Sequence, residues 1–262
     1  MKFDLRLFIR DSVLTTKHYT NVIEFTREHK LWKGITSYRW LSKLLILAGI
    51  LLGLKFLSVC INWWQQEDSG LSLAGISGFF SSILTEGYEL FVIGGFKYVI
   101  LILLEVVIFH FSRRTLEVLS GEEVESSFDA FAKAQIRMIG VSVYSFIMES
   151  IFSILAGIAL SILGLGVMKA LVVWFIQCYF LGFAIVDNYN EIYGMTLKQS
   201  ARYTWNYAGV ALSTGVIVYM LMLIPLVGII LGPLTGAIAA TITMYQLGEK
   251  DQKLELVFEE EP

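Results

Sequence analysis

Residues 209–246 read GVALSTGVIVYMLMLIPLVGIILGPLTGAIAATITMYQ, and none of these side chains is charged. One helix crosses a bilayer with about 20 residues, so the stretch is long enough for two crossings joined by a turn. Pro225 and Pro233 lie near its middle and favour such a turn. Its backbone groups must pair inside helices, because lipid offers them no hydrogen-bond partners. The stretch therefore predicts an all-α integral membrane protein.

The composition of the whole chain supports this prediction. Of the 262 residues, 56% are hydrophobic and 16% are charged, against about 25% charged in a soluble domain. The net charge of −3 is too small to indicate a nucleic-acid partner, so the expected environment is the lipid bilayer. The N-terminus is charged and has no apolar core of a cleavable signal peptide.

Hydrophobic blocks divide the chain into about six membrane segments, because the last block reads as a hairpin. The connections within the hairpins are so short that these hairpins either cross the membrane or dip partway in and return. An amphipathic N-terminal region over 1–40 precedes the single membrane domain at 41–246, and an acidic tail over 247–262 follows it. The blocks are 41–61, 90–111, 138–164, 167–187 and 209–246.

The distribution of Lys and Arg predicts an orientation. Residues 62–89 contain neither Lys nor Arg, whereas 112–137 and 188–208 carry several of them. The positive-inside rule then places both termini in the cytoplasm, as in a protein of the bacterial inner membrane.

Two cytoplasmic helices are predicted from capping boxes, in which a Ser or Thr is followed three residues later by Glu or Gln. Ser120 with Glu123 starts one helix, and Thr196 with Gln199 starts the other. The aromatic residues around the second helix predict a belt at the membrane interface. They are Tyr189, Tyr193, Tyr203, Trp205 and Tyr207.

Four charged residues interrupt the apolar segments: Lys55, Lys97, Glu105 and Glu149. A charge at this depth is costly, so each is a candidate functional residue. The two lysines fall at matching depth, and three interpretations stay open: extension to the headgroups, attraction of an anion, or pairing with one of the glutamates. The two glutamates are either hydrogen-bonded structural carboxyl groups or members of a proton relay.

Glycines recur every fourth residue in the last hairpin, at Gly228, Gly232 and Gly236, and Gly49 and Gly53 repeat the spacing. Such spacing lets helix backbones approach closely and is also found where a second copy of a chain packs. No histidine spacing, phosphate loop or nucleophile motif indicates an enzyme, a metal site or a cofactor.

The segment 175–247 resembles the C-terminal part of the etoposide-induced membrane protein family, which includes the CysZ-like sulfate permeases. The similarity is strongest here and weaker upstream. At the membrane entry, His29 to Trp32 stand where the sulfate permeases carry an Arg after a Gly-Leu pair. The matching motif residues, with structural roles implied by the resemblance, are Tyr179, Gly182, Asp187, Gly194, Pro225, Gly228, Gly232, Pro233 and Gly236.

The resemblance implies permeation of a small inorganic anion, with sulfate as the expected substrate. The two lysines, Lys55 and Lys97, are then the candidate anion contacts. The alternative is a membrane scaffold or accessory subunit that transports nothing and binds partner proteins through its cytoplasmic helices and glycine-rich faces.

Overall fold

The structure is a computed structural model that describes residues 4–35, 95–124, 128–224 and 227–251. Within these ranges every regular element is a helix, as the sequence predicts. The elements are α1 (Leu5–Glu28), α4 (Phe96–Ser120), α5 (Phe128–Ile162), the short 3₁₀ turn η3 (Gly166–Met168), α6 (Lys169–Ile192), α7 (Leu197–Asn206), α8 (Ala208–Met222) and α9 (Val227–Asp251).

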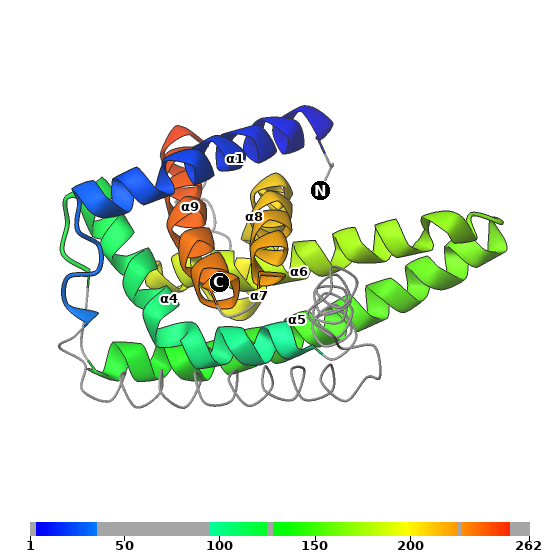
Figure 1. The fold of residues 1–262 in the computed structure, drawn as a ribbon, viewed down its shortest axis with the longest axis horizontal. Coiled ribbons are helices and arrows are strands. Elements are labelled where there is room, and N and C mark those ends of the chain that lie inside the picture. Colours follow the sequence, from blue (N-terminus) through cyan, green and yellow to red (C-terminus); the bar gives the residue numbers. More distant parts are fainter. Residues whose placement is uncertain (1–3, 36–94, 125–127, 225–226, 252–262) are drawn as a thin grey trace, which may run out of the picture.

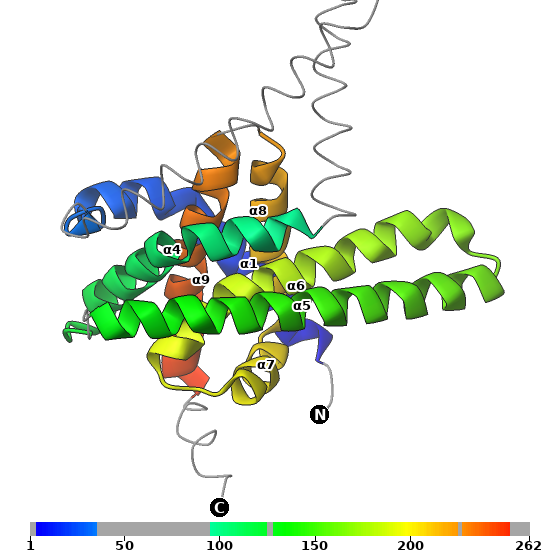
Figure 2. The ribbon, with the colours of Figure 1, turned by 90° about the horizontal axis from the view of Figure 1, so that it is seen from below.

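Two hairpins organise the described part of the molecule. Figure 1 shows α8 and α9 between α1 on one side and the long α5–α6 hairpin on the other. Figure 2 shows the α8–α9 pair running crosswise to the α5–α6 hairpin, whose tip extends well beyond the body. Helix α4 packs against α5, α6 and α9 and thereby connects the two hairpins.

Three helices are long and apolar enough to cross a membrane: α5, α9, and α6 together with the turn before it. A fourth candidate is α7 followed by α8, although this pair bends by 94° at the break. The six segments expected from the sequence are therefore not confirmed. The predicted segment at 41–61 and both glycines of the 49/53 pair lie outside the described residues.

The connection between α4 and α5 corrects one expectation. Ser120 is the last residue of α4, and Gly121 ends the helix in a left-handed conformation with φ +74°. The Ser120 hydroxyl accepts the Glu122 N–H at 3.2 Å, so the predicted capping box with Glu123 does not form. Helix α5 then runs unbroken from Phe128 through the expected membrane segment, because no proline interrupts it.

The second predicted capping box is confirmed. The Thr196 side chain accepts the Gln199 N–H at 3.3 Å, while the Gln199 side chain accepts the Thr196 N–H at 2.8 Å. These bonds satisfy two backbone donors that the first turn of α7 leaves open. The position of α7 against the end of α6 is therefore set locally, next to the turn at Gly194.

The expected aromatic belt is wrong for three of its members. Tyr189, Tyr203 and Tyr207 are each 1% exposed and form a buried cluster with Val186, Val210 and other apolar side chains. Trp205 is exposed. Tyr189 on α6 meets Tyr203 and Tyr207, which lie at the sharp bend between α7 and α8, and residue spacing alone does not reveal this contact.

Candidate functional site

Lys97 and Glu149 form a buried ion pair between α4 and α5. The Lys97 Nζ atom donates to Glu149 Oε1 at 2.7 Å, and the side chain of Lys97 is 1% exposed. The neighbouring Tyr98 hydroxyl donates to Glu149 Oε2, also at 2.7 Å. Of the three interpretations of Lys97, the structure shows the pairing with a glutamate. Extension to the headgroups does not fit an ammonium group enclosed by protein.

Lys97 has more hydrogen-bond donors than the pair uses. Both oxygens of Glu149 accept a bond, whereas the ammonium of Lys97 has three donors and one described acceptor. The ammonium of Lys97 therefore has more donors than the described residues satisfy. Lys55, the other predicted anion contact, lies outside the described residues.

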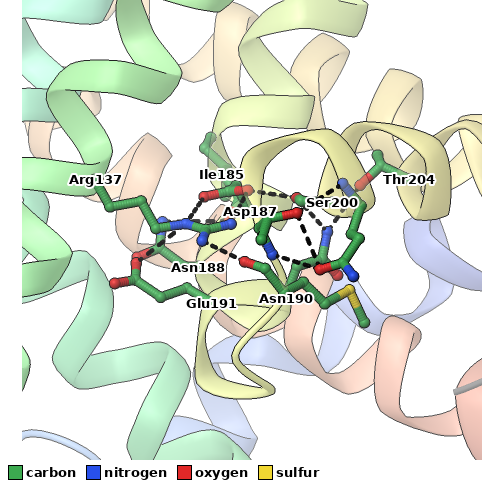
Figure 3. Close-up of polar contacts among 11 residues, drawn as sticks. Arg137, Ile185, Asp187, Asn188, Asn190, Glu191, Ser200 and Thr204 are labelled. Carbon is green, nitrogen blue, oxygen red and sulfur yellow. Dashed lines mark hydrogen bonds and ion pairs between the residues drawn. The ribbon is translucent and has the colours of Figure 1, made fainter. Parts of the chain in front are cut away.

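A second polar cluster surrounds Arg137 on α5 (Figure 3). Its Nε and Nη2 atoms donate to the two carboxylate oxygens of Asp187 on α6, each at 2.8 Å. A third bond from Arg137 reaches the Met195 carbonyl, and a Glu191 oxygen lies 3.8 Å from Nε. This two-pronged geometry matches the planar guanidinium to a carboxylate and holds α5, α6 and the turn before α7 together.

The cluster continues from Asp187 into α7. The Ser200 hydroxyl donates to Asp187, and the Asn190 side-chain amide donates to Ser200 and to Thr204, each at 2.9 Å. Ser200, Asn190 and Thr204 are completely buried. The network therefore fixes α7 against α6 through polar contacts in the interior, and its members are called the Arg137 network below.

Glu105 lies close to the Arg137 network and differs from every other buried carboxyl group described. It is 0% exposed, and neither of its oxygens has a hydrogen-bond partner among the described residues. Glu191, Asp187 and Arg137 all act on it electrostatically. The two glutamates predicted to lie in the membrane therefore have different environments. Glu149 accepts hydrogen bonds from Lys97 and Tyr98, and Glu105 has no donor of comparable strength.

Most residues of the family-like motif lie in helix contacts. The Tyr179 ring packs edge-on against Trp205, with centroids 5.8 Å apart. Gly182 sits where α6 meets α8, and Gly194 takes φ +71° in the turn after α6. Pro233 lies inside α9, and Pro225 lies outside the described residues. The series Gly228, Gly232 and Gly236 faces α8.

Sequence reasoning missed Arg137, Asn190, Ser200 and Thr204. Arg137 ends the basic connection 112–137, which the positive-inside rule assigns to the cytoplasm, so its position within a long continuous helix was not apparent. The available signal was the polar run at the end of α6, Asp187, Asn188 and Asn190, which follows a strongly apolar segment. Within the described ranges no group of His, Cys, Asp or Glu could hold a metal ion.

Comparisons with protein-family models, curated proteins and solved structures gave no match to this chain.

Proposed function

We propose that this protein is a permeation protein for a small inorganic anion, with sulfate the expected substrate by resemblance. The observation that carries the proposal is the buried Lys97–Glu149 pair. A charge inside an apolar helix bundle is costly, and in membrane proteins such charges often mark ion and substrate pathways. The apolar helices α5, α6 and α9 support the membrane location on which the proposal depends.

In this proposal the carboxylate of Glu149 binds the ammonium of Lys97 while no substrate anion is bound. An incoming anion takes the ammonium from the carboxylate, and Tyr98 continues to hold Glu149 through its other oxygen. The pair lowers the cost of keeping a lysine buried while no anion is present. The anion must also compete with Glu149 for the ammonium of Lys97. This competition weakens anion binding and so helps the anion to leave.

The test is uptake of radiolabelled sulfate into proteoliposomes. Lys97→Gln is expected to abolish most uptake, and Lys97→Arg to retain part of it, because the charge remains while the geometry changes. Glu149→Gln is expected to lower the sulfate concentration that gives half-maximal uptake, because the internal competitor loses its charge. Lys169→Gln, at the exposed tip of the α5–α6 hairpin, is the matched control and should leave uptake unchanged.

The second candidate is a membrane scaffold, favoured by the surface of the projecting hairpin. Helix α5 exposes large apolar side chains along most of its length, and only 17% of its most apolar window is buried. Such a surface fits a partner helix as well as lipid. Wild-type protein that reconstitutes normally but takes up no more sulfate than empty liposomes would favour the scaffold. The apolar residues include Val143, Phe146, Ile147, Ile151, Ile154, Leu155 and Ile158.

A further inference from the structure

Glu105 lies in the middle of α4, within the hydrophobic core of the described helices. The residues before and after it on α4, Leu104 and Val106, are buried and apolar. Its own side chain has no exposed surface, and neither oxygen makes a hydrogen bond of good geometry within residues 4–35, 95–124, 128–224 and 227–251; the Asn188 side-chain amide is the one uncharged donor that acts on it. A carboxyl group in such surroundings has lost its hydrogen bonds to water, and the protein does not replace them with strong hydrogen bonds of its own.

The charged groups facing Glu105 come from the two helices next to it. Asp187 and Glu191 act on it from α6, Arg137 acts on it from α5, and the Asn188 amide is the one uncharged polar group among the groups that influence it. Three carboxyl groups therefore surround one guanidinium. Arg137 is already bound by both oxygens of Asp187, so it has little capacity left to neutralise a second carboxylate.

The charge balance of this cluster determines whether the Glu105 carboxyl group is protonated. If all three carboxyl groups were ionised, the buried cluster would have a surplus of two negative charges. Removing water from an unpaired carboxylate costs far more than keeping its proton, so a group in this position is stable as the neutral acid. Glu149 is the opposite case, because Lys97 and Tyr98 donate to it and stabilise its charge.

We propose that Glu105 is a proton-binding site, which holds a proton at neutral pH in the folded protein, whereas both oxygens of Glu149 accept hydrogen bonds from Lys97 and Tyr98. Proton binding at Glu105 does not require that the protein transports an anion.

Loss of this proton would weaken the contact between α4 and α6. The O–H bond of the Glu105 carboxyl breaks, the proton passes to water, and the electron pair stays on the carboxylate. The new negative charge repels Asp187 and Glu191 and attracts Arg137, so it competes for the guanidinium that joins α5 to α6. Among the three carboxyl groups of the cluster, Glu191 is the most exposed, at 15%, against 3% for Asp187 and 0% for Glu105, so we expect the proton to leave through Glu191.

Infrared difference spectroscopy of the full-length protein in lipid nanodiscs tests the protonation state directly. The wild type should show the carbonyl stretch of a protonated carboxyl group, Glu105→Gln should lose this band, and Glu149→Gln should keep it. A band unchanged in Glu105→Gln, or no such band in the wild type at neutral pH, would overturn the proposal.

Thermal unfolding provides a second, independent measurement. If Glu105 is neutral, Glu105→Gln and Glu105→Met replace one uncharged side chain by another, and their melting temperatures should stay close to that of the wild type. Glu149→Gln should melt clearly lower, because it leaves Lys97 buried without its counter-charge. A large loss of stability in both Glu105 variants would contradict the proposal, since it would show that the carboxylate is ionised and paired.

Discussion

At the scale of single residues, the Arg137–Asp187 pair is a two-pronged polar contact between α5 and α6. Asp187→Asn removes the charge that faces the half-buried guanidinium and should destabilise the protein by about 3 kcal/mol, the lower end of the cost of breaking a buried pair. The measurement is thermal or denaturant unfolding in detergent. Arg202→Ala, an exposed arginine on the neighbouring α7, is the matched control and should change stability by less than about 0.5 kcal/mol. Equal effects of the two variants would show that the buried pair adds nothing.

His18 gives a pH-dependent prediction outside the membrane segments. Thr243 donates its hydroxyl to the Ala239 carbonyl at 2.8 Å, so it accepts from His18 Nδ1 at 2.9 Å. Burial, and then the charge of Lys17, lower the pKa of His18. A lowered pKa in the folded protein means that the stabilising contribution of neutral His18 is complete above about pH 6.5 and is lost as pH falls through the folded value.

Acidification from about pH 7 to about pH 5 should therefore lower the melting temperature of the wild type. His18→Gln should reduce this dependence, because glutamine can donate a similar bond without titrating. The half-exposed His29 serves as the control site, and His29→Gln should leave the dependence as it is. If the melting temperature of His18→Gln fell with pH as much as that of the wild type, another titratable group would be responsible.

The sequence identified some of these residues and not others, for physical reasons. Lys97, Glu105 and Glu149 stand out because a charge in an apolar run is visible without a structure. Arg137 does not stand out, since a charged residue in an amphipathic pattern fits a surface helix equally well. Its partner Asp187 is 50 residues away, and no local pattern predicts which helices will meet.

At the scale of helices, α6 and α8 pack with their backbones almost in contact. A Cβ atom on Gly182 would lie 1.8 Å from the Ala211 carbonyl oxygen, and one on Gly215 would lie 1.6 Å from the Cys178 carbonyl oxygen. The sequence predicts the contact of α9 from its four-residue glycine spacing. It could not predict the pairing of Gly182 with Gly215, because those two glycines belong to different segments with no shared period.

Gly182→Ala and Gly215→Ala should therefore each force α6 and α8 apart and destabilise the protein by about 1–3 kcal/mol. Gly140→Ala on α5 is the control, because nothing lies within 4 Å of its added Cβ atom. That change should be neutral or stabilising by up to about 1 kcal/mol, since alanine favours a helix over glycine. Melting temperatures in detergent distinguish these outcomes. Identical behaviour of all three variants would mean that α6 and α8 separate without cost.

At the scale of the whole molecule, the Lys and Arg distribution predicts the orientation in the membrane. In a background without Cys60 and Cys178, a cysteine introduced at Ser77 should react with an impermeant thiol reagent added outside intact cells. A cysteine at the exposed Lys198 should react only after the cells are opened, because α7 is expected in the cytoplasm. Labelling of the Lys198 site in intact cells would reverse the orientation. The all-helical fold was predictable from hydropathy alone, whereas the crosswise arrangement of the two hairpins depends on contacts between distant segments.

The Lys97–Glu149 pair also has a consequence for biogenesis. The ribosome makes Lys97 first, and Glu149 follows 52 residues later. While α4 leaves the translocon, its lysine has no counter-charge and its own Glu105 adds a further polar group, so the helix alone is a poor candidate for release into lipid. Release becomes favourable once α5 is synthesised and supplies the carboxylate. We therefore expect nascent chains arrested before Glu149 to keep α4 beside the translocon, and chains arrested after α5 to let both helices enter the bilayer as a pair.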